Sequence, residues 1–184
     1  AAGEVDRFIF GFEESYGYLA GSYVRDKDAV VASMLICEMA AFYRTKGISL
    51  IQARENMYKK YGVYVHSQSS FVCEGVTGME RMKEIMSDLR TNTPKTIGGL
   101  TVTRFEDYLA STSVDTATGA KTMLTLPKSD VLTFKLTDGA SVIIRPSGTE
   151  PKIKAYYTTT GTTKAEAAAL EKTISDDFAK ILGF

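Results

Sequence analysis

Residues 131–159 read VLTFKLTDGASVIIRPSGTEPKIKAYYTT. Three strand-like runs, 131–136, 140–145 and 152–159, alternate here with two turn signals. The first, Thr137-Asp138-Gly139, is typical of a tight hairpin, and the second has a proline at each end. Because short turns join strands that lie side by side, the stretch predicts a sheet of neighbouring antiparallel strands.

The remainder of the C-terminal half extends this layer. Hydrophobic periodicity predicts strands over 63–72 and 100–108 and helices over 77–89 and 163–181. Both helices open on a capping-box spacing, at Thr77 and Thr163. Residues 111–130 show little periodicity and predict either a mobile loop or an irregular hairpin. Strands with helices on a sheet face indicate an α+β domain.

The first sixty residues follow a different pattern. An apolar run over 7–12 predicts a buried strand that ends in the polar loop 13–18. Residues 29–43 are apolar on nearly every side, which predicts a helix covered by neighbours rather than by water. A second helix begins at the capping-box spacing 49–52 and stops at Gly62. One strand and two helices therefore form the first unit.

Composition argues against several classes of partner. Twenty-two basic residues balance twenty-two acidic ones, so the broad positive field that drives binding to nucleic acid or anionic membranes is missing. The longest apolar stretch, 29–42, falls short of the roughly 20 residues that a bilayer span needs. Cys37 and Cys73 lack the spacing of a zinc site and are expected to be buried reduced thiols. We expect a cytoplasmic protein without nucleic-acid or membrane partners.

The segment Arg145-Pro146-Ser147-Gly148-Thr149-Glu150-Pro151 is chemically suited to phosphate. A phosphate dianion needs converging donors and a positive charge, and the segment supplies a guanidinium, two hydroxyls and the accessible backbone of Gly148. The two prolines fix its ends and remove part of the ordering entropy before a ligand binds. The residue types alone also fit a rigid polar turn that carries a surface arginine.

A second polar segment, Glu13-Glu14-Ser15-Tyr16-Gly17-Tyr18, is suited to reading sugar hydroxyls. A carboxylate with a hydroxyl two residues away can bracket a vicinal diol, and a tyrosine ring can shield it from water. The cluster Arg25-Asp26-Lys27-Asp28 follows, which fits either a cation near a bound anion or a helix start. Taken alone, both segments also fit solvated loops.

Together these segments resemble a known family. Gly11 to Tyr18, followed by Val24 to Asp28, is similar to the sugar-binding loop and adjoining helix start in the third domain of alpha-D-phosphohexomutases, the phosphoglucomutase/phosphomannomutase family. Arg145 to Lys152 is similar to the phosphate-binding loop of their fourth domain. The motifs occur in the family's order, and the resemblance extends over essentially the whole chain. It implies a C-terminal fragment of such an enzyme.

The resemblance also implies the fold and the site. Residues 1–65 would be the C-terminal portion of the α/β sugar-binding third domain, and 66–184 a complete fourth domain of the TATA-binding-protein-like α+β type, with an antiparallel sheet packed by helices. In the first, the expected sugar-binding residues are Glu13, Ser15 and Lys27. In the second, the expected phosphate-binding residues are Arg145, Ser147, Gly148 and Thr149.

The activity implied is that of an intramolecular phosphotransferase, which interconverts hexose 1-phosphate and hexose 6-phosphate through a phosphoserine and a bisphosphorylated sugar of the glucose 1,6-bisphosphate type. The phosphoserine loop and the Asp-x-Asp-x-Asp loop for Mg²⁺ are absent from this sequence. We therefore expect no catalytic residue and no metal ligand in this segment, and no turnover without the N-terminal domains. The Glu-Glu-Ser-Tyr-Gly form of the sugar loop resembles glucose and mannose mutases more than the glucosamine-phosphate branch.

Two other functions remain to be weighed against this one. The first is a stand-alone sugar-phosphate binding module without catalysis, which the sequence encoded upstream of Ala1 would distinguish from a mutase. The second is a nucleic-acid binder, which would need a basic face and salt-dependent affinity. The balanced charge argues against the second.

Overall fold

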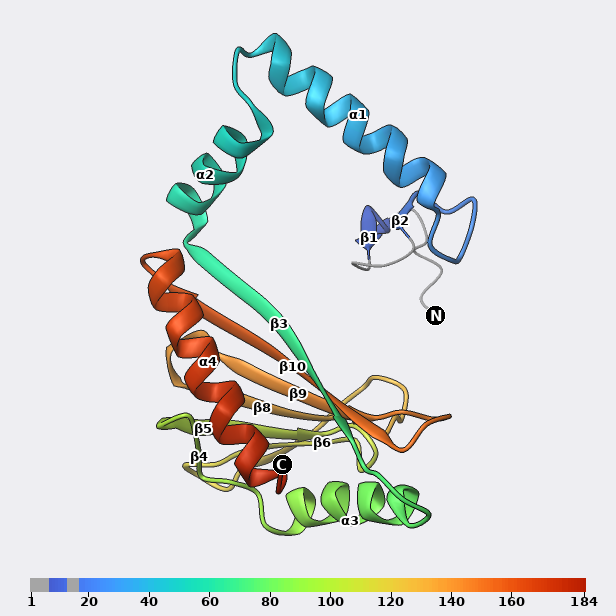
Figure 1. Cartoon of the computed structure of the whole chain (residues 1–184), viewed down its shortest axis with the longest axis vertical. Coiled ribbons are helices and arrows are strands. Elements are labelled where there is room, and N and C mark those ends of the chain that lie inside the picture. The colour runs from blue at the N-terminus through green and yellow to red at the C-terminus, as the bar shows by residue number, and fades with distance from the viewer. Residues whose placement is uncertain (1–6, 13–16) are drawn as a thin grey trace. The chain divides into compact units, whose positions relative to one another are not determined.

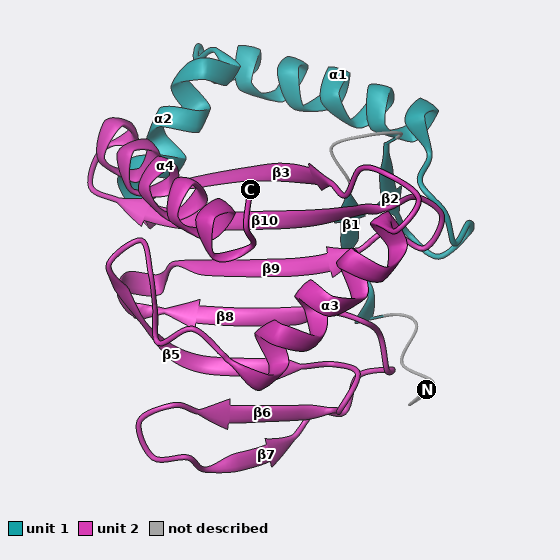
Figure 2. Ribbon diagram, turned by 60° about the horizontal axis from the view of Figure 1, so that its bottom comes forward, with its two compact units in different colours: residues 1–60 teal, residues 61–184 magenta. Residues whose placement is uncertain are grey.

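The computed structural model describes residues 7–12 and 17–184. The chain divides into two compact units, 1–60 and 61–184 (Figures 1 and 2). The family resemblance rests partly on Glu13 and Ser15, and both lie outside the described residues. Within residues 7–12 and 17–184, no helix is long and apolar enough to cross a bilayer.

The first unit holds a short hairpin and two helices. Its elements are β1 (Phe10–Phe12), β2 (Tyr18–Ala20), α1 (Ala29–Thr45) and α2 (Leu50–Tyr61). Strands β1 and β2 pair antiparallel. Asp28 caps α1, because its Oδ1 accepts hydrogen bonds from the backbone N–H of Val30 at 2.8 Å and of Val31 at 3.0 Å. Both helices are confirmed, and each is followed by a glycine with positive φ, Gly47 or Gly62.

Burial in the first unit differs from what the sequence predicted. The strand expected over 7–12 is limited to β1, and Phe12 is 69% exposed. Helix α1 was expected to be covered by neighbours, yet Val30 is 81% exposed and Phe42 is 56% exposed, while Ala32 is buried. Cys37 was expected to be buried and is exposed. The cause is common to all three, since periodicity reports that a face is apolar and does not report what covers it.

The second unit is an antiparallel sheet with two helices on one face (Figure 2). Its elements are β3 (Val63–Val72), α3 (Gly78–Thr91), β4 (Thr96–Ile97), β5 (Leu100–Asp107), β6 (Thr112–Asp115), β7 (Lys121–Met123), β8 (Leu132–Leu136), β9 (Ser141–Pro146), β10 (Lys152–Gly161) and α4 (Lys164–Ile181). The strand order is β3-β10-β9-β8-β5-β6-β7, with β4 beside β5, and every pair is antiparallel. The predicted α+β fold is confirmed.

The core lies between the sheet and its helices. Alternate residues of β10, among them Ile153 and Tyr157, are buried against side chains such as Ile174 and Phe178 of α4 and Met86 of α3. The intervening residues of β10, among them Lys152 and Lys154, lie on the other face of the sheet. The binary pattern of the strands therefore decides which residues of β9 and β10 reach the open face.

Helix starts agree with the sequence at α4 and differ at α3. The predicted capping box at Thr163 is present, with the Thr163 hydroxyl accepting from the backbone N–H of Glu166 and the Glu166 carboxylate accepting from that of Thr163. The capping box predicted at Thr77 was wrong, because the Thr77 side chain makes no capping hydrogen bond within the described chain. Instead, the backbone N–H of Gly78 donates to the carbonyl of Gly75 at 3.1 Å, so a backbone turn begins α3.

Residues 111–130, expected to be either a mobile loop or an irregular hairpin, form a hairpin of β6 and β7. Thr112 pairs with Met123 across it. The turn is closed by Asp115, whose Oδ1 accepts from the backbone N–H and the hydroxyl of Thr118, at 2.9 Å and 2.8 Å. These hydrogen bonds hold the pKa of Asp115 below its usual value. Two short strands give too few residues for a periodic signal, which explains why the sequence left the alternatives open.

Arg90 links helix α3 to the sheet through two ion pairs. Its Nε donates to Asp107 at 3.1 Å, and its Nη2 pairs with Asp130 in the segment before β8. Burial by itself lowers the pKa of Arg90, but the hydrogen bonds and the attraction of Asp130 and Asp107 outweigh it and raise the pKa overall. Asp107 also ends β5, because its Oδ1 accepts from the backbone N–H of Leu109 at 2.9 Å.

Replacing Arg90 by methionine should lower the free energy of unfolding of the second unit by about 2 kcal/mol, because Asp107 is buried and would keep its charge without the guanidinium that balances it. Chemical denaturation monitored by circular dichroism measures this. Lys83→Met, on the exposed side of the same helix, is the matched control and should change the value by less than about 0.5 kcal/mol. Equal effects of the two variants would contradict a structural role for the pair.

Candidate functional site

The predicted phosphate-binding residues come together in the hairpin that joins β9 to β10. Arg145 lies near the end of β9, and Ser147, Gly148 and Thr149 follow it in the connection, which we call the phosphate loop (residues 145–151). The loop is closed by two backbone hydrogen bonds. Ser147 N–H donates to the carbonyl of Lys152 at 2.8 Å, and Lys152 N–H donates to that of Glu150 at 2.7 Å. A short closed hairpin of this kind limits the freedom of the groups that it presents.

The open face of the sheet carries a basic hollow beside the phosphate loop. It measures about 220 Å³ and is lined by Arg145, Pro146, Ser147, Gly148, Glu150, Lys152 and Lys154. Lys154 lies directly opposite Arg145 in the pairing of β9 with β10. Like charges directly opposite on neighbouring strands repel each other. A bound dianion would relieve this repulsion.

Glu150 is the carboxylate that lines this hollow. Its Oε2 lies 2.5 Å from the Nζ of Lys152. The hydrogen bond from Lys152, with the attraction of Lys152 and Lys154, holds the pKa of Glu150 below its usual value. One of the three cations is therefore already paired, while Arg145 and Lys154 bring two further positive charges to the same hollow.

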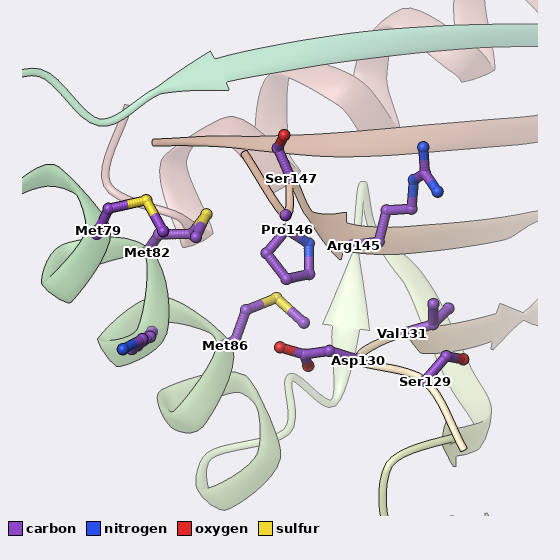
Figure 3. A pocket seen from close by; sticks show the side chains of 11 residues that line it. Met79, Met82, Met86, Ser129, Asp130, Val131, Arg145, Pro146 and Ser147 are labelled. Atoms are coloured by element: carbon purple, nitrogen blue, oxygen red, sulfur yellow. The ribbon is translucent and has the colours of Figure 1, made fainter. Parts of the chain in front are cut away.

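A second pocket, of about 400 Å³, lies on the helix side of the phosphate loop (Figure 3). Its walls are Met79, Met82, Lys83 and Met86 of α3, Ser129, Asp130 and Val131 before β8, and Arg145 to Gly148. In Figure 3 the ring of Pro146 faces Met86, whereas the side chain of Arg145 extends away from the methionines. The loop thus presents an apolar side to α3 and its cation to the open face.

The predicted sugar-binding segment belongs to the first unit. Lys27 is half-buried, and its backbone N–H donates to Oδ1 of Asp26 at 2.7 Å. The neighbouring Asp28 also accepts a hydrogen bond from the hydroxyl of Tyr23 at 3.0 Å. Hydrogen bonds from the backbone of Val31 and from Tyr23 lower the pKa of Asp28. Asp28 is therefore a helix cap, while Lys27 stands at the start of α1.

Gly17, which follows the residues expected to bind sugar, lies close to Asp28. It has a φ of 112°, and a Cβ at this position would lie 2.5 Å from the carbonyl oxygen of Asp28. The next residue, Tyr18, pairs with Asp28 through two backbone hydrogen bonds, of 2.8 Å and 3.3 Å. Glycine is thus required at residue 17, where the backbone lies against the residue that caps α1.

Sequence reasoning missed Lys154 and Lys152 as part of the basic hollow. Both follow the phosphate loop at alternate positions of a predicted strand, so they share one face. Combining that alternation with the hairpin pairing would have placed Lys154 beside Arg145. The signal was present in the pattern of residues 145–154.

Among the side chains that the structure describes, no group of three or more His, Cys, Asp and Glu is arranged to hold a metal ion. Two described carboxylates of the candidate segments are engaged elsewhere, since Asp28 caps α1 and Glu150 pairs with Lys152. The described residues therefore do not fit a Mg²⁺ site, and no step below is assigned to a metal held by them.

Comparison with known proteins agrees with both units. Residues 2–61 match the family model for phosphoglucomutase/phosphomannomutase, alpha/beta/alpha domain III, and residues 81–176 match that for the C-terminal domain of the same enzymes. A phosphoglucomutase of Staphylococcus aureus is 40% identical over 148 residues, and that of Staphylococcus haemolyticus is 35% identical over 153 residues. These alignments cover 80% and 83% of this chain but 27% and 28% of the relatives.

A solved structure shares the fold. The open form of pp63/parafusin, a phosphoglucomutase from Paramecium, superposes with a TM-score of 0.61 at 18% identity, over 92% of this chain and 29% of its own. The chain thus corresponds to little more than a quarter of the length of these relatives. With one family model covering residues 81–176 and another covering residues 2–61, the chain belongs to the phosphoglucomutase/phosphomannomutase family.

Proposed function

We propose that this chain is the substrate-holding C-terminal part of a phosphohexomutase that interconverts the 1- and 6-phosphates of glucose, mannose or both. The observation that carries the proposal is the convergence of Arg145, Ser147, Gly148 and Lys154 around one basic hollow, with Thr149 in the same loop but not among the residues that line it. Such a hollow suits a phosphate dianion, because a guanidinium fork, hydroxyls and an ammonium group converge on it.

The proposed role of the phosphate loop is to hold the phosphate that does not react. Phosphoryl transfer depends mainly on positioning and on neutralising charge at the transferred group. Binding of the distal phosphate in one position would orient the sugar. Either its 1-position or its 6-position would then face a phosphoserine supplied by the rest of the enzyme. One loop would then serve both half-reactions, with a bisphosphorylated sugar of the glucose 1,6-bisphosphate type as the intermediate.

For the sugar, we propose contacts from Glu13, Ser15 and Lys27 of the first unit, taken as the C-terminal portion of domain III over residues 1–65. Domain IV would then comprise residues 66–184. Carboxylate and hydroxyl oxygens accept and donate to the diol of a hexose, and an ammonium group balances a nearby phosphate. In this proposal the first unit recognises the sugar hydroxyls and the second unit binds the phosphate.

The chemistry itself would come from N-terminal domains that accompany this segment. The Mg²⁺ that the family resemblance implies would neutralise charge at the transferred phosphoryl group, and we propose that it is held there together with the phosphoserine. The isolated 184-residue chain should then bind hexose phosphates without turning them over. We also propose that the whole enzyme acts in the cytoplasm, where hexose phosphates are its partners.

A chimera tests this function directly. This chain should replace the corresponding segment of the Staphylococcus aureus phosphoglucomutase, to which it is 40% identical. The chimera is expected to convert glucose 1-phosphate to glucose 6-phosphate, measured by a coupled dehydrogenase assay, whereas the 184-residue chain alone is expected to show no conversion. A folded chimera that binds hexose phosphate but has no mutase activity would favour the alternative, a stand-alone sugar-phosphate binding module.

Lys154 provides a prediction within the same hollow. Replacing it by alanine should weaken binding of inorganic phosphate to the chain by about fivefold, roughly 1 kcal/mol, because a positive charge is lost from a solvent-accessible site. The control is Lys135→Ala, an exposed lysine of β8 outside the hollow. Titrations at two salt concentrations should show the difference shrinking as salt rises. Equal phosphate affinities of the Lys154 and Lys135 variants would show that Lys154 does not contribute to phosphate binding.

A further inference from the structure

The turn between β3 and α3 contacts the far end of the phosphate loop. The backbone N–H of Cys73 donates to the carbonyl of Pro151 at 2.7 Å. Cys73 is 1% exposed, so this hydrogen bond lies in the interior, where losing a partner is costly. Pro151 immediately precedes Lys152, whose backbone N–H and carbonyl close the loop through Glu150 and Ser147. The turn is thus linked by consecutive hydrogen bonds to the predicted phosphate-binding residues.

Gly78 determines how closely this turn approaches the loop. It is the first residue of α3 and is buried. A Cβ at this position would lie 2.0 Å from the carbonyl oxygen of Cys73 and 3.0 Å from the Cβ of Pro151. A separation of 2.0 Å is far inside van der Waals contact, so any side chain must displace the Cys73 carbonyl, and the backbone N–H of the same residue bonds Pro151.

We propose that Gly78 is a positioning residue of the phosphate site, acting through the backbone of Cys73 and through Pro151. The inference rests on the proposed function, since it assumes that the loop binds phosphate. A methyl group at residue 78 would displace Cys73, weaken its hydrogen bond to Pro151 and shift the closing bonds at Lys152. Hydrogen bonds to an anion weaken steeply when donors move by fractions of an ångström. Phosphate affinity should therefore fall although no group that touches phosphate has changed.

Gly98 supplies a matched control for Gly78→Ala. A Cβ there would also strike backbone, at 2.8 Å from the Cα of Ile174 in α4. Gly98 lies before β5, which runs parallel to β9 by way of β8, so it stands at the opposite end of the sheet from the phosphate loop (Figure 2). Both substitutions are expected to destabilise the second unit through a steric overlap. Gly78→Ala alone would also disturb the hydrogen bond between Cys73 and Pro151.

The experiment is a titration of the 184-residue chain with inorganic phosphate, followed through the amide NMR signals of Gly148 and Thr149. It is performed well below the melting temperature of each variant. Gly78→Ala should raise the dissociation constant at least fivefold, whereas Gly98→Ala should stay within twofold of the unmodified chain. Val76→Ala, at a fully exposed position of the same turn, should also stay within twofold. Equal affinities of the Gly78 and Gly98 variants would overturn the inference.

A second measurement needs no variant and therefore holds even if Gly78→Ala does not fold. Coupling between two sites is reciprocal, so phosphate binding must stabilise the Cys73–Pro151 hydrogen bond if that bond favours phosphate binding. Saturating phosphate should slow hydrogen exchange of the Cys73 amide at least fivefold. The Gly98 amide, which donates to Asp177 at 2.7 Å, should be unchanged. Unchanged exchange at Cys73 would contradict the proposal.

Failure of this inference is distinguishable from failure of the proposed function. If Arg145→Ala leaves phosphate affinity unchanged, the phosphate site itself is misassigned. The proposed positioning role of Gly78 is then also wrong. If Arg145→Ala weakens binding while Gly78→Ala behaves like Gly98→Ala, the site stands and Gly78 is required for folding alone.

Discussion

In the chimera with the Staphylococcus aureus enzyme, Arg145→Ala is expected to lower kcat/KM about 100-fold, which corresponds to roughly 3 kcal/mol of transition-state stabilisation. The guanidinium is the group in the phosphate loop that can bind a phosphate through two parallel hydrogen bonds. Its loss would leave the hollow with Lys154 and with Lys152, whose charge Glu150 already balances. Because the distal phosphate orients the sugar for transfer at its other end, the loss extends beyond weaker binding.

The control for this variant is Arg104→Ala. Arg104 is an exposed arginine of β5 that pairs with Asp115 across the sheet and does not line the basic hollow. Its removal changes the net charge equally and should leave kcat/KM within about twofold. A threefold or smaller loss for Arg145→Ala in a folded chimera would show that the phosphate loop does not hold the substrate. Arg145→Lys should recover part of the activity, because the charge returns without the fork.

Gly98→Ala is expected to lower the free energy of unfolding of the second unit by about 3 kcal/mol. The new methyl group would lie 2.7 Å from the Cγ1 and 2.8 Å from the Cα of Ile174, which is fully buried in α4. Overpacking against a fixed backbone costs roughly 1 to 3 kcal/mol. The φ of 59° at Gly98 adds about 1 kcal/mol for any residue with a Cβ. Thermal unfolding of the chain should show a fall of roughly 10 °C for the second unit.

Gly99→Ala separates the two causes. Gly99 also has a positive φ, of 78°, but no described atom lies within 4 Å of the position that its Cβ would take. Its substitution should cost about 1 kcal/mol from backbone strain alone. The difference between the variants then measures the overlap with α4. If both variants lose the same stability, the close approach of the β4–β5 turn to α4 is not what requires glycine at residue 98.

The C-terminal sheet was predictable because its signals are local. The hairpins on either side of β9 are marked by Thr137-Asp138-Gly139 and by the two prolines of the phosphate loop, and the four predicted phosphate-binding residues occupy that one loop. The capping box at Thr163 is equally local and is confirmed. Features set within a few residues can be read from sequence, since no distant partner decides them.

The remaining features depend on contacts between distant residues. The start of α3 did not follow its capping-box pattern, because the turn from Cys73 to Gly78 is shaped by the contact with Pro151. Lys154 joins the basic hollow through its pairing with Arg145, a relation that needs the strand register as well as the residue types. The exposure of α1 was missed for the same reason, since the sequence of an apolar helix does not show which residues pack against it.

The central claim is that the phosphate loop of this chain binds the phosphate of a hexose phosphate. The most direct test is an NMR titration of the 184-residue chain with glucose 1-phosphate, with assigned backbone amides. The account predicts saturable shifts concentrated at Ser147, Gly148, Thr149 and Lys154, weakened at least tenfold by Arg145→Ala, a change of about 1.4 kcal/mol. Shifts that avoid residues 145–154, or an affinity that Arg145→Ala leaves unchanged, would contradict it.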